Sequence, residues 1–511
     1  MACPERARWP RTRLKSPSGE GGITHNDPMQ RILSGQPHGL FDIATTRLIE
    51  QAAAAALPAH TLMQRAGLQV ARLALALAPH AHTMWVACGP GNNGGDGLEA
   101  AAHLRQWGKN VVVTWLGDES TAPPDALASL RHARAQGVHF SDSPPQDYGL
   151  CIDALLGIGA ARAPTGRMAE WIGLMNAARA PVLAVDVPSG LNAETGTREL
   201  CVNANHTLAL LTLKPGLFTA QGRDAAGEVW FDDIGVQPAS AAAQEPPCAR
   251  LAATPSSRMR PHASHKGSFG DVAIVAGAPG MTGAALLAAS GALHSGAGRV
   301  LVCLLDGGSL RVDASQPELM FRDVGQMDFR RTTVVCGCGG GDAVREVLAR
   351  VCSTALRLVL DADALNAVAA DSQFEILPKA RAARGLQTVM TPHPLEAARL
   401  LGATAVQVQA NRLDAARQLA ARFVCTVALK GSGTVIASPG DVSLINPTGN
   451  ALLATAGTGD VLAGMVGAGL AAGLPAPQAA AEAVYGHGLL ADLWPAGHAL
   501  TARLLAASAR P

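Results

Sequence analysis

Lysine is scarce in this chain, with six residues among 511, at positions 15, 109, 214, 266, 379 and 430. The formal net charge is +1, and no long block of like charge is present. A dedicated nucleic-acid binder would be more basic, so we expect no nucleic-acid partner. Because arginine supplies most of the positive charge, each retained lysine is of interest. Lys214, Lys266 and Lys430 lie beside glycine or proline.

Paired cysteine motifs are also missing. The ten cysteines are scattered without a C-x-x-C, and Cys336 and Cys338 form the one close pair. A structural zinc site would need two such pairs, or histidines at the spacing of a zinc finger. The pattern predicts reduced thiols, buried as small apolar side chains in a cytoplasmic protein.

No hydrophobic run is long enough to span a membrane without a break. The longest uncharged stretches, 272–298 and 461–481, are interrupted by glycine and proline, whereas a spanning helix needs about 20 mostly apolar residues. The first 28 residues are arginine-rich but lack the apolar core of a secretory signal. We expect no membrane segment and a loose leader over 1–40. Met29 is the expected true start, and a transit peptide is the alternative.

The length and the apolar content of 48 % allow two to four domains. Thr46 to Leu77 has a helical pattern, and apolar strand-like segments then alternate with helical stretches. This alternation predicts a parallel sheet that is covered on both faces. The strands of the first half are predicted at 84–87, 110–116, 150–155, 181–186 and 206–212.

A segment rich in proline, serine and alanine over 236–265 has no periodicity and predicts a domain boundary. We therefore expect an α/β domain over 41–236, a linker over 237–262 and a second α/β domain over 263–511. The halves are not sequence repeats of each other. The strands of the second half are predicted at 271–276, 299–304, 332–336, 356–361, 388–390, 426–430 and 433–437.

The segment Gly-Pro-Gly-Asn-Asn-Gly-Gly-Asp-Gly over 89–97 directly follows the first of these strands. We interpret it as a binding loop whose glycines take positive φ and let the backbone approach a ligand. The next helix would offer free N–H groups to a phosphate. A simple tight turn is the alternative, but it would need fewer glycines.

Two further strand ends carry carboxylates, Asp153 and Asp186. Ligands of open α/β sheets bind at the carboxyl ends of the strands, so the three segments are predicted to meet in one crevice. Each aspartate alone could instead be a turn or cap residue. Lys214 follows the fifth strand and either adds a cation to the site or lies in a surface turn.

These segments, with Glu50-Gln-Ala-Ala and Leu62-Met-Gln-Arg-Ala-Gly67, resemble the NAD(P)H-hydrate epimerase family over about residues 45–236. The resemblance implies a Rossmann-like three-layer fold that binds hydrated NADH or NADPH, with Asp186 catalytic. It also implies a potassium ion held by Asn93, Asp153 and Ser189. The implied substrate contacts are Asn92, Asn93, Gly94, Gly95, Asp96, Gly157, Ile158, Gly159, Ala160, Ala161, Arg162 and Ala163.

Near the other end, Gly457-Thr-Gly-Asp opens an apolar helix. Its N–H groups would stabilise a phosphoryl group, and Asp460 could take a proton from a hydroxyl. A plain helix cap is the alternative. Lys430 stands at a strand end beside a Gly-Ser turn, where a compact cation suits a phosphate. His393 lies between two prolines and is predicted to be outside any helix.

The second half resembles the ADP- or ATP-dependent NAD(P)H-hydrate dehydratases, which are ribokinase-like, over about residues 250–505. The segments that carry the resemblance begin at His265, Gly277, Asp361, Thr391, Lys430 and Ala456. It implies Mg²⁺, ADP or ATP as cosubstrate, and Asp460 as the base. The implied contacts are Ala284, Gly339 and His393 to the dinucleotide and Lys430, Gly431, Ser432, Gly433, Thr434 and Gly459 to the nucleotide. One departure is Gly337-Cys-Gly-Gly-Gly in place of Gly-Pro-Gly-Leu-Gly.

Together the two resemblances imply a bifunctional repair enzyme. An N-terminal isomerase would interconvert the R and S hydrates, and a C-terminal lyase would dehydrate the S hydrate to NAD(P)H. Phosphorylation would turn the hydroxyl into a better leaving group. The alternatives are a small-molecule kinase with a regulatory N-terminal domain, and a non-catalytic binding protein. We expect a homo-oligomer, and the preferences for ADP or ATP and for NADH or NADPH hydrate stay open.

Overall fold

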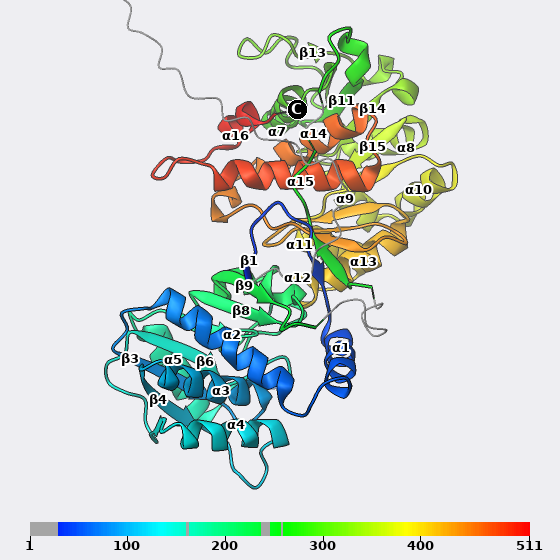
Figure 1. Cartoon of the computed structure of the whole chain (residues 1–511). Coiled ribbons are helices and arrows are strands. Elements are labelled where there is room, and N and C mark those ends of the chain that lie inside the picture. Colours follow the sequence, from blue (N-terminus) through cyan, green and yellow to red (C-terminus); the bar gives the residue numbers. More distant parts are fainter. Residues whose placement is uncertain (1–28, 160–162, 237–245, 257–258, 511) are drawn as a thin grey trace, which may run out of the picture.

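The computed structural model describes residues 29–159, 163–236, 246–256 and 259–510. Two β-sheets, each packed against helices, form two halves of the molecule (Figure 1). The helices of the first half are α1 (Ile43–Ala55), α2 (Thr61–Leu77), α3 (Asn92–Gln106), α4 (Pro124–Ala135), α5 (Gly166–Ala177) and α6 (Gly222–Ala225). Its strands are β1 (Gln30–Arg31), β3 (Thr83–Cys88), β4 (Asn110–Trp115), β5 (His139–Phe140), β6 (Leu150–Ala154), β7 (Val182–Val185), β8 (His206–Leu210) and β9 (Glu228–Asp232).

The first sheet has the order β1-β9-β8-β7-β6-β3-β4-β5, and every pairing except β1 with β9 is parallel. Side chains of β3 alternate between its two faces, as the period of a strand requires. Met84 and Val86 pack toward α2 and α3, whereas Trp85 packs toward α5 with Trp171. This confirms the predicted parallel sheet with covered faces.

The second sheet has the order β13-β12-β11-β14-β15-β16-β17-β18-β19-β10-β2. Its strands are β2 (Gly39–Leu40), β10 (Ala249–Leu251), β11 (Asp271–Ala276), β12 (Arg299–Leu304), β13 (Met320–Phe321), β14 (Thr333–Cys336), β15 (Arg357–Leu360), β16 (Thr388–Met390), β17 (Thr426–Leu429), β18 (Val435–Ala437) and β19 (Ser443–Ile445). From β13 to β17 the pairing is parallel, and β17, β18 and β19 are antiparallel neighbours.

Helices cover both faces of the second sheet as well. In β11, Val272 and Ile274 pack with α7, α14, α15 and α16, and Ala273 and Val275 pack with the other helices. The bounds are α7 (Thr282–His294), α8 (Val344–Thr354), α9 (Ala362–Ala370), α10 (Ser372–Ala383), α11 (Pro394–Leu401), α12 (Ala405–Ala410), α13 (Arg412–Phe423), α14 (Thr458–Ala471), α15 (Ala476–Asp492) and α16 (Ala502–Ser508).

Two expected boundaries are wrong in part. β1 and β2 lie inside the expected leader 1–40, and β10 lies inside the expected linker 237–262. β2 and β10 pair with each other at the edge of the second sheet, and β10 also pairs with β19. Leu40 of β2 and Leu251 of β10 are buried in the core, but a strand of two or three residues is too short to show a periodic pattern, so the sequence does not reveal it. Residues 1–28 and 237–245 lie outside the described part.

The helical pattern predicted over 46–77 is also interrupted. α1 ends at Ala55 and α2 begins at Thr61, with Pro58 between them and His60 at φ 68°. A proline inside a helix removes a hydrogen bond and clashes with the preceding turn, which explains the break. Within the described residues, no helix combines the length and the apolar character that crossing a membrane requires.

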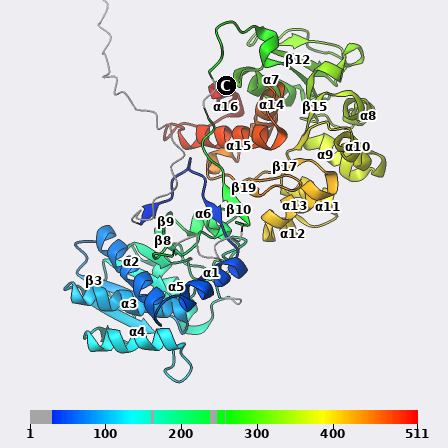
Figure 2. The ribbon, with the colours of Figure 1, turned by 45° about the vertical axis from the view of Figure 1, so that its right-hand side comes forward.

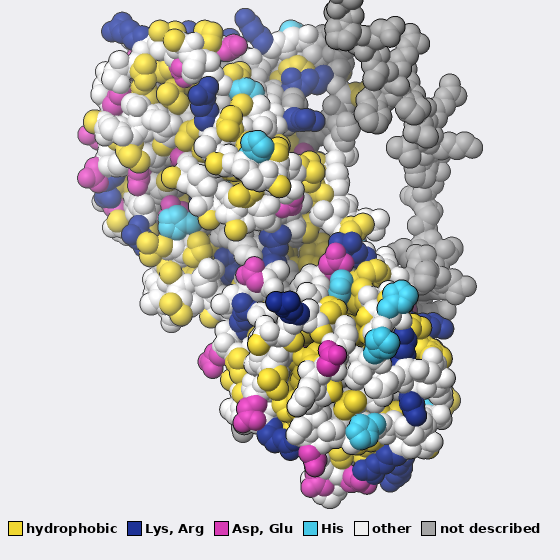
Figure 3. Space-filling view, turned by 90° about the vertical axis from the view of Figure 1, so that its left-hand side faces the viewer, with side chains coloured by type: hydrophobic (Ala, Val, Ile, Leu, Met, Phe, Trp, Pro, Cys, Tyr) yellow, Lys and Arg dark blue, Asp and Glu magenta, His cyan; other side chains and the backbone are white. Residues whose placement is uncertain are grey.

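The two halves meet through backbone contacts of the segment 211–225 (Figure 2). The Phe41 N–H donates to the Leu213 carbonyl (2.8 Å), and the Ala220 N–H donates to the Ser432 carbonyl (3.0 Å). The Arg223 guanidinium donates to the carbonyls of Pro447 and Gly449. One hydrophobic core cluster includes residues of both halves. Figure 3 shows two lobes joined at a narrower junction, with charges of both signs scattered over the visible face.

Candidate active sites

A cavity of about 590 Å³ opens at the carboxyl ends of β3, β6 and β7. Its lining includes the predicted residues Asn92, Asn93, Asp96, Gly157, Ile158, Gly159 and Asp186. The predicted crevice is therefore present, and three segments far apart in the sequence form it. Ala163 is exposed and does not line the cavity. The predicted contacts Ala160, Ala161 and Arg162 lie outside the described residues.

The role that we assigned to the glycines of 89–97 is wrong. Helix α3 already begins at Asn92, so Asn-Asn-Gly-Gly-Asp forms its first turns, and none of these glycines has a positive φ. They allow close packing instead. A Cβ on Gly89 would lie 1.7 Å from the Leu155 carbonyl oxygen, and one on Gly94 would lie 2.1 Å from the Gly89 carbonyl oxygen. The segment stays a candidate binding element because Asn92 and Asp96 face the cavity.

Asp153 and Ser189 form a buried polar cluster beside this cavity. The Ser189 hydroxyl donates to Asp153 Oδ1 (2.6 Å), and the backbone N–H of Ser189 donates to Asp153 Oδ2 (2.8 Å). Burial raises the pKa of Asp153 to about 6. The amide nitrogen of Asn93 is buried without a hydrogen-bond partner, and its side chain lies against Gly157. The unpartnered amide N–H does not bind a cation, but the buried carboxylate, hydroxyl and amide oxygens of this cluster are the donors that a hard cation prefers.

Asp186 is held by a buried lysine. Its carboxylate forms an ion pair with Lys214, whose side chain is 1 % exposed, and it accepts a hydrogen bond from the Leu210 N–H (3.1 Å). Lys214 also donates to the Leu210 carbonyl (2.9 Å). Asp186 adopts φ 66°, a conformation that aspartate tolerates better than most residues. Of the two roles considered for Lys214, the structure excludes the surface turn.

Two further carboxylates share the cavity with Asp186. Glu50 comes from α1 and Asp96 from α3. Burial and the neighbouring Asp186 raise the pKa of both groups. Glu50 begins one of the segments that carry the resemblance, but we predicted no role for it, because an isolated glutamate on a helix gives no signal of its own. Perturbed carboxylates gathered in a cavity are typical of catalytic sites.

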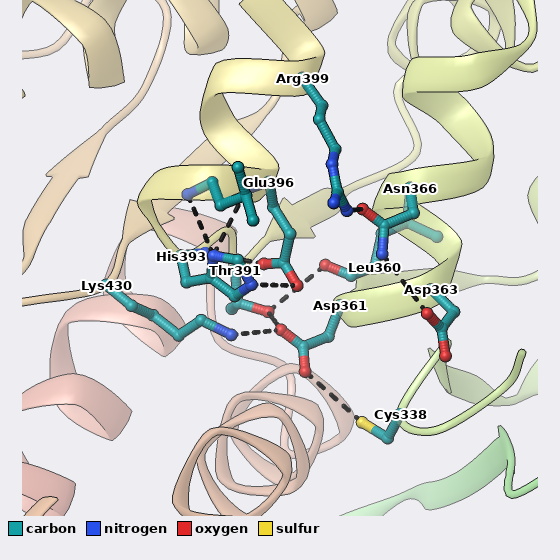
Figure 4. A network of polar contacts seen from close by, with 11 residues as sticks. Cys338, Leu360, Asp361, Asp363, Asn366, Thr391, His393, Glu396, Arg399 and Lys430 are labelled. Atoms are coloured by element: carbon teal, nitrogen blue, oxygen red, sulfur yellow. Dashed lines mark hydrogen bonds and ion pairs between the residues drawn. The ribbon is translucent and has the colours of Figure 1, made fainter. Parts of the chain in front are cut away.

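The second site centres on Asp361, which follows β15 (Figure 4). Asp361 Oδ1 accepts hydrogen bonds from Lys430 Nζ (2.7 Å) and from the Thr391 hydroxyl (2.7 Å). Burial would lower the pKa of Lys430, but Asp361 and Glu396 reverse this, and the net shift is upward. The lysine that follows β17 therefore stays cationic inside the protein, where it can meet a phosphate.

Asp460 lies in the first turn of α14, after Gly457 at φ 87°. Burial raises the pKa of Asp460 to about 7, and the carboxylates of Asp361 and Asp363 add to the shift. A Cβ on Gly459 would lie 3.3 Å from Lys430 Nζ, so the lysine reaches the start of this helix. A proton-accepting carboxylate, a cation and free helix N–H groups thus occupy one place.

The loop 337–341 brings Gly339 to Ala284. A Cβ on Gly339 would lie 2.9 Å from the Ala284 side chain, and the Ala278 N–H donates to the Gly339 carbonyl (2.7 Å). His393 caps α11, as its position outside a helix predicted. Its Nδ1 accepts from the Leu395 N–H (3.1 Å), and its Nε2 lies 3.2 Å from Glu396. Both ring nitrogens are thus engaged within the protein.

The glycines of the segment 430–434 have packing reasons of their own. A Cβ on Gly431 would lie 2.7 Å from the Arg412 guanidinium, and one on Gly433 would lie 2.1 Å from the Phe218 carbonyl oxygen. The Ser432 carbonyl accepts from the first half, and Thr434 bonds to the Gly431 carbonyl (3.1 Å). Lys430 and Gly459 therefore face the site directly, whereas Ser432 and Gly433 also form part of the junction.

In comparisons with known proteins, the two halves of the chain match two different family models. Residues 59–216 match the family model described as YjeF-related protein N-terminus, and residues 272–510 match that of NAD(P)H-hydrate dehydratase. A bifunctional NAD(P)H-hydrate repair enzyme of Escherichia coli is 37 % identical over 475 residues, 89 % of this chain and 90 % of the relative. That of Leishmania braziliensis is 35 % identical over 487 residues, 85 % of this chain and 84 % of the relative.

The chain belongs to the bifunctional NAD(P)H-hydrate repair enzyme family. This confirms the two resemblances, and with the two sheets it confirms the expected fold classes. A solved structure, the ADP/ATP-dependent NAD(P)H-hydrate dehydratase of Bacillus subtilis crystallised with ATP and Mg²⁺, is 30 % identical. It covers 49 % of this chain and 90 % of its own, with a TM-score of 0.41. As a member of this family, the chain is an enzyme of NAD(P)H-hydrate repair.

Proposed function

We propose that each half catalyses one of the two steps of the repair. The N-terminal half interconverts the R and S hydrates of NADH and NADPH, and the C-terminal half dehydrates the S hydrate with ADP or ATP. The observation that carries this proposal is the pair of strand-end sites on one chain. One holds the Asp186–Lys214 ion pair in a cavity, and the other holds Asp460 beside Lys430.

In the N-terminal site, Asp186 transfers the proton at the hydrated carbon. Lys214, which is buried in the lining of the cavity, fixes the position of the Asp186 carboxylate and balances its charge. Asn92, Asn93 and Asp96, with the segment 157–163, bind the substrate. A volume of about 590 Å³ lies within the usual range of pockets for small ligands.

We further propose that Asn93, Asp153 and Ser189 hold a potassium ion. A bound cation supplies the charge that the buried carboxylate of Asp153 otherwise lacks. Its expected effect is stabilisation. The temperature of unfolding should be higher in potassium chloride than in choline chloride at equal ionic strength, and Asp153→Asn should remove this difference.

In the C-terminal site, Asp460 accepts the proton of the substrate hydroxyl while a phosphoryl group is transferred to its oxygen. Lys430 and the N–H groups at the start of α14 stabilise the transferred group. Phosphate then leaves from the ring more readily than hydroxide would. The carboxylates of Asp361 and Asp363 lie near enough to act on Asp460, and their oxygens are donors that would fit Mg²⁺ and leave Asp460 free as the base. Magnesium, when bound, neutralises charge on the phosphates.

The assay that tests both activities follows the near-ultraviolet absorbance of reduced nicotinamide in a mixture of the two hydrates. Wild-type protein with Mg²⁺ and ADP or ATP should restore the band fully. Asp186→Asn should stop at the fraction present as one epimer, while spontaneous epimerisation is slow. Asp460→Asn should restore none.

The outcomes separate the alternatives. A stable phosphorylated product without recovery of the band would favour a small-molecule kinase. Folded wild-type protein that binds the hydrates without any turnover would favour a binding protein. Equal activity of Asp186→Asn and the wild type would remove Asp186 from its proposed role.

We also propose that the enzyme is a cytoplasmic homo-oligomer. Nine cysteines of the described part are free, and eight of them are buried, as a reducing compartment permits. Light scattering on the purified chain would give its mass, and a mass of 52.3 kDa would exclude an oligomer.

A further inference from the structure

Cys338 occupies an unusual place in the dehydratase site. It is fully buried, and its Sγ lies 3.6 Å from Asp361 Oδ2 (Figure 4). One ligand atom from each of Cys338, Asp361 and Asp460 lies within 4.8 Å of the other two. The three residues come from the loop after β14, the start of α9 and the start of α14. Three potential metal ligands from separate elements thus converge on one point.

The backbone on either side of Cys338 is held in place by its neighbours. The carbonyl of Cys338 accepts a hydrogen bond from the Gly277 N–H (3.0 Å). The preceding Gly337 has φ 117°, and a Cβ there would lie 2.0 Å from the Asp361 carbonyl oxygen. Because the flanking backbone packs directly on Asp361, the thiol and the carboxylate are held together before any ligand arrives.

The separation of the two ligand atoms suits a tetrahedral metal ion. With bonds of about 2.3 Å to sulfur and about 2.1 Å to oxygen, two tetrahedral ligands of zinc lie about 3.6 Å apart. The observed Sγ–Oδ2 distance is 3.6 Å. Oδ1 of Asp361 is already bonded to Lys430 and Thr391, which orients Oδ2 toward the thiol. Such outer partners commonly orient metal ligands.

The charges also balance. A thiolate and two carboxylates carry three negative charges, which a divalent ion and the adjacent Lys430 cancel. Binding would release the thiol proton to solvent, because the thiolate is the form that ligates a metal. Mg²⁺ prefers oxygen ligands, whereas zinc and cadmium accept sulfur. The thiol therefore adds affinity for a class of ion that the reaction itself does not use.

We propose that Cys338, Asp361 and Asp460 form a binding site for a thiophilic divalent cation of the zinc class, and that occupancy blocks dehydration. The block rests on the proposed role of Asp460 as the base, which a bound ion would engage. The binding itself rests on the geometry alone. The second half would thus be inhibited by zinc or cadmium at concentrations that leave the first half active.

The binding is tested with Cd²⁺, whose bond to a thiolate gives a charge-transfer band in the ultraviolet. Full-length wild-type protein should show a saturable band. In Cys338→Ser, the part of the band that one thiolate contributes should be lost. The variant should also bind the ion at least about 100-fold more weakly, because even the loss of a residue that only hydrogen-bonds to a metal ligand weakens binding roughly 10–100-fold. The matched control is Cys303→Ser, which removes an equally buried thiol from β12.

Two further variants guard the interpretation. Asp460→Asn should weaken Cd²⁺ binding while the band is retained at saturation. Cys338→Ala replaces Cys338→Ser if the latter unfolds at a lower temperature than Cys303→Ser. A Cd²⁺ affinity and band equal to those of the wild type in the Cys338 variant would overturn the proposal. So would a band that Cys303→Ser abolishes.

The inhibition is measured separately, as the dehydration rate with Zn²⁺ divided by the rate without it, at constant Mg²⁺. This ratio should fall for the wild type and stay near unity for the Cys338 variant. Zinc inhibition that is equal in both would overturn the proposed block. A protein that binds Cd²⁺ through Cys338 but never dehydrates the hydrate would instead contradict the proposed function and leave the metal site standing.

Discussion

At the scale of single residues, the ion pair of Asp186 and Lys214 links stability to the proposed epimerase chemistry. Lys214→Met leaves the Asp186 carboxylate in a largely buried place without its cation. Breaking such a pair costs about 3–5 kcal/mol, whereas removing both charges is often nearly neutral. We therefore expect a large loss of stability and of epimerisation in Lys214→Met. The double variant Lys214→Met with Asp186→Asn should regain stability but not activity.

Urea unfolding of the single and double variants measures this coupling, and the hydrate assay measures the activity. The dehydration of purified S hydrate serves as an internal control, because the second site lies in the other half. Additive losses of stability in the double variant would contradict a direct ion pair.

The raised pKa of Asp460 predicts opposite pH trends for stability and rate. The folded-state value of about 7 exceeds the usual carboxyl value of about 4. Between these limits the folded protein binds more protons than the unfolded chain, so the contribution of Asp460 to the free energy of unfolding decreases as pH rises. The dehydration rate should increase over the same range, because a base acts only when ionised.

The dehydration rate at saturating nucleotide and the urea midpoint, both measured from about pH 5 to pH 8, test these trends. Asp460→Asn provides the comparison, since it cannot titrate and should flatten this part of the stability curve. A wild-type rate that is constant through pH 7 would argue against Asp460 as the base.

At the scale of elements, the turn between β17 and β18 contains residues 430–434, which we predict to contact the nucleotide. The same turn packs against the first half. Gly433→Ala would place a Cβ 2.1 Å from the Phe218 carbonyl oxygen at φ 63°. Gly440→Ala, between β18 and β19, has a similar φ of 80° but open space around it. The strain of a left-handed conformation costs about 1–2 kcal/mol in both. The clash adds to this only in Gly433→Ala, which should also weaken nucleotide binding.

The two alanine variants are compared by thermal unfolding and by titration with nucleotide. Gly440→Ala reports the backbone strain alone, and Gly433→Ala reports the strain together with the clash. Equal losses of thermal stability and of nucleotide affinity in both variants would show that the backbone around residue 433 moves enough to relieve the clash.

The sequence predicts those elements whose residues carry a repeating physical signal. Runs such as Val111 to Val113 alternate with helices and predict the parallel sheets, which the structure confirms. β2 and β10 escape prediction because two or three residues are too few to show an alternation, although Leu40, Ala249 and Leu251 are buried in the core. The cavity at the strand ends follows from topology, but the burial of Lys214 depends on how a turn folds back onto Asp186. Likewise, the glycines of 89–97 are dictated by contacts with distant backbone, which composition does not reveal.

At the scale of the whole molecule, we expect the junction to couple the unfolding of the two halves. Arg223 donates from α6 to the carbonyls of Pro447 (3.0 Å) and Gly449 (2.8 Å) in the second half. Hydrogen bonds from a charged group contribute about 1.5–3 kcal/mol each. A ligand that binds the folded form at 100 times its dissociation constant stabilises it by about 2.7 kcal/mol. Through the junction, part of that stabilisation should reach the first half.

We expect ADP to increase the hydrogen-exchange protection of β8 in the wild type, although β8 lies in the first half, and Arg223→Ala to abolish this increase. Arg134→Ala is the matched control, because Arg134 lies in α4 of the first half and forms an exposed pair with Glu119 there. An exposed pair contributes about 0–1 kcal/mol, so this variant should behave as the wild type. Equal protection of β8 by ADP in Arg223→Ala and in the wild type would show that Arg223 is not needed for the coupling. The β2–β10 pairing would then couple the two halves, and Arg223 would only orient the lobes. If ADP protected β8 in none of the proteins, the halves would unfold independently, because a ligand stabilises only what unfolds together with its site.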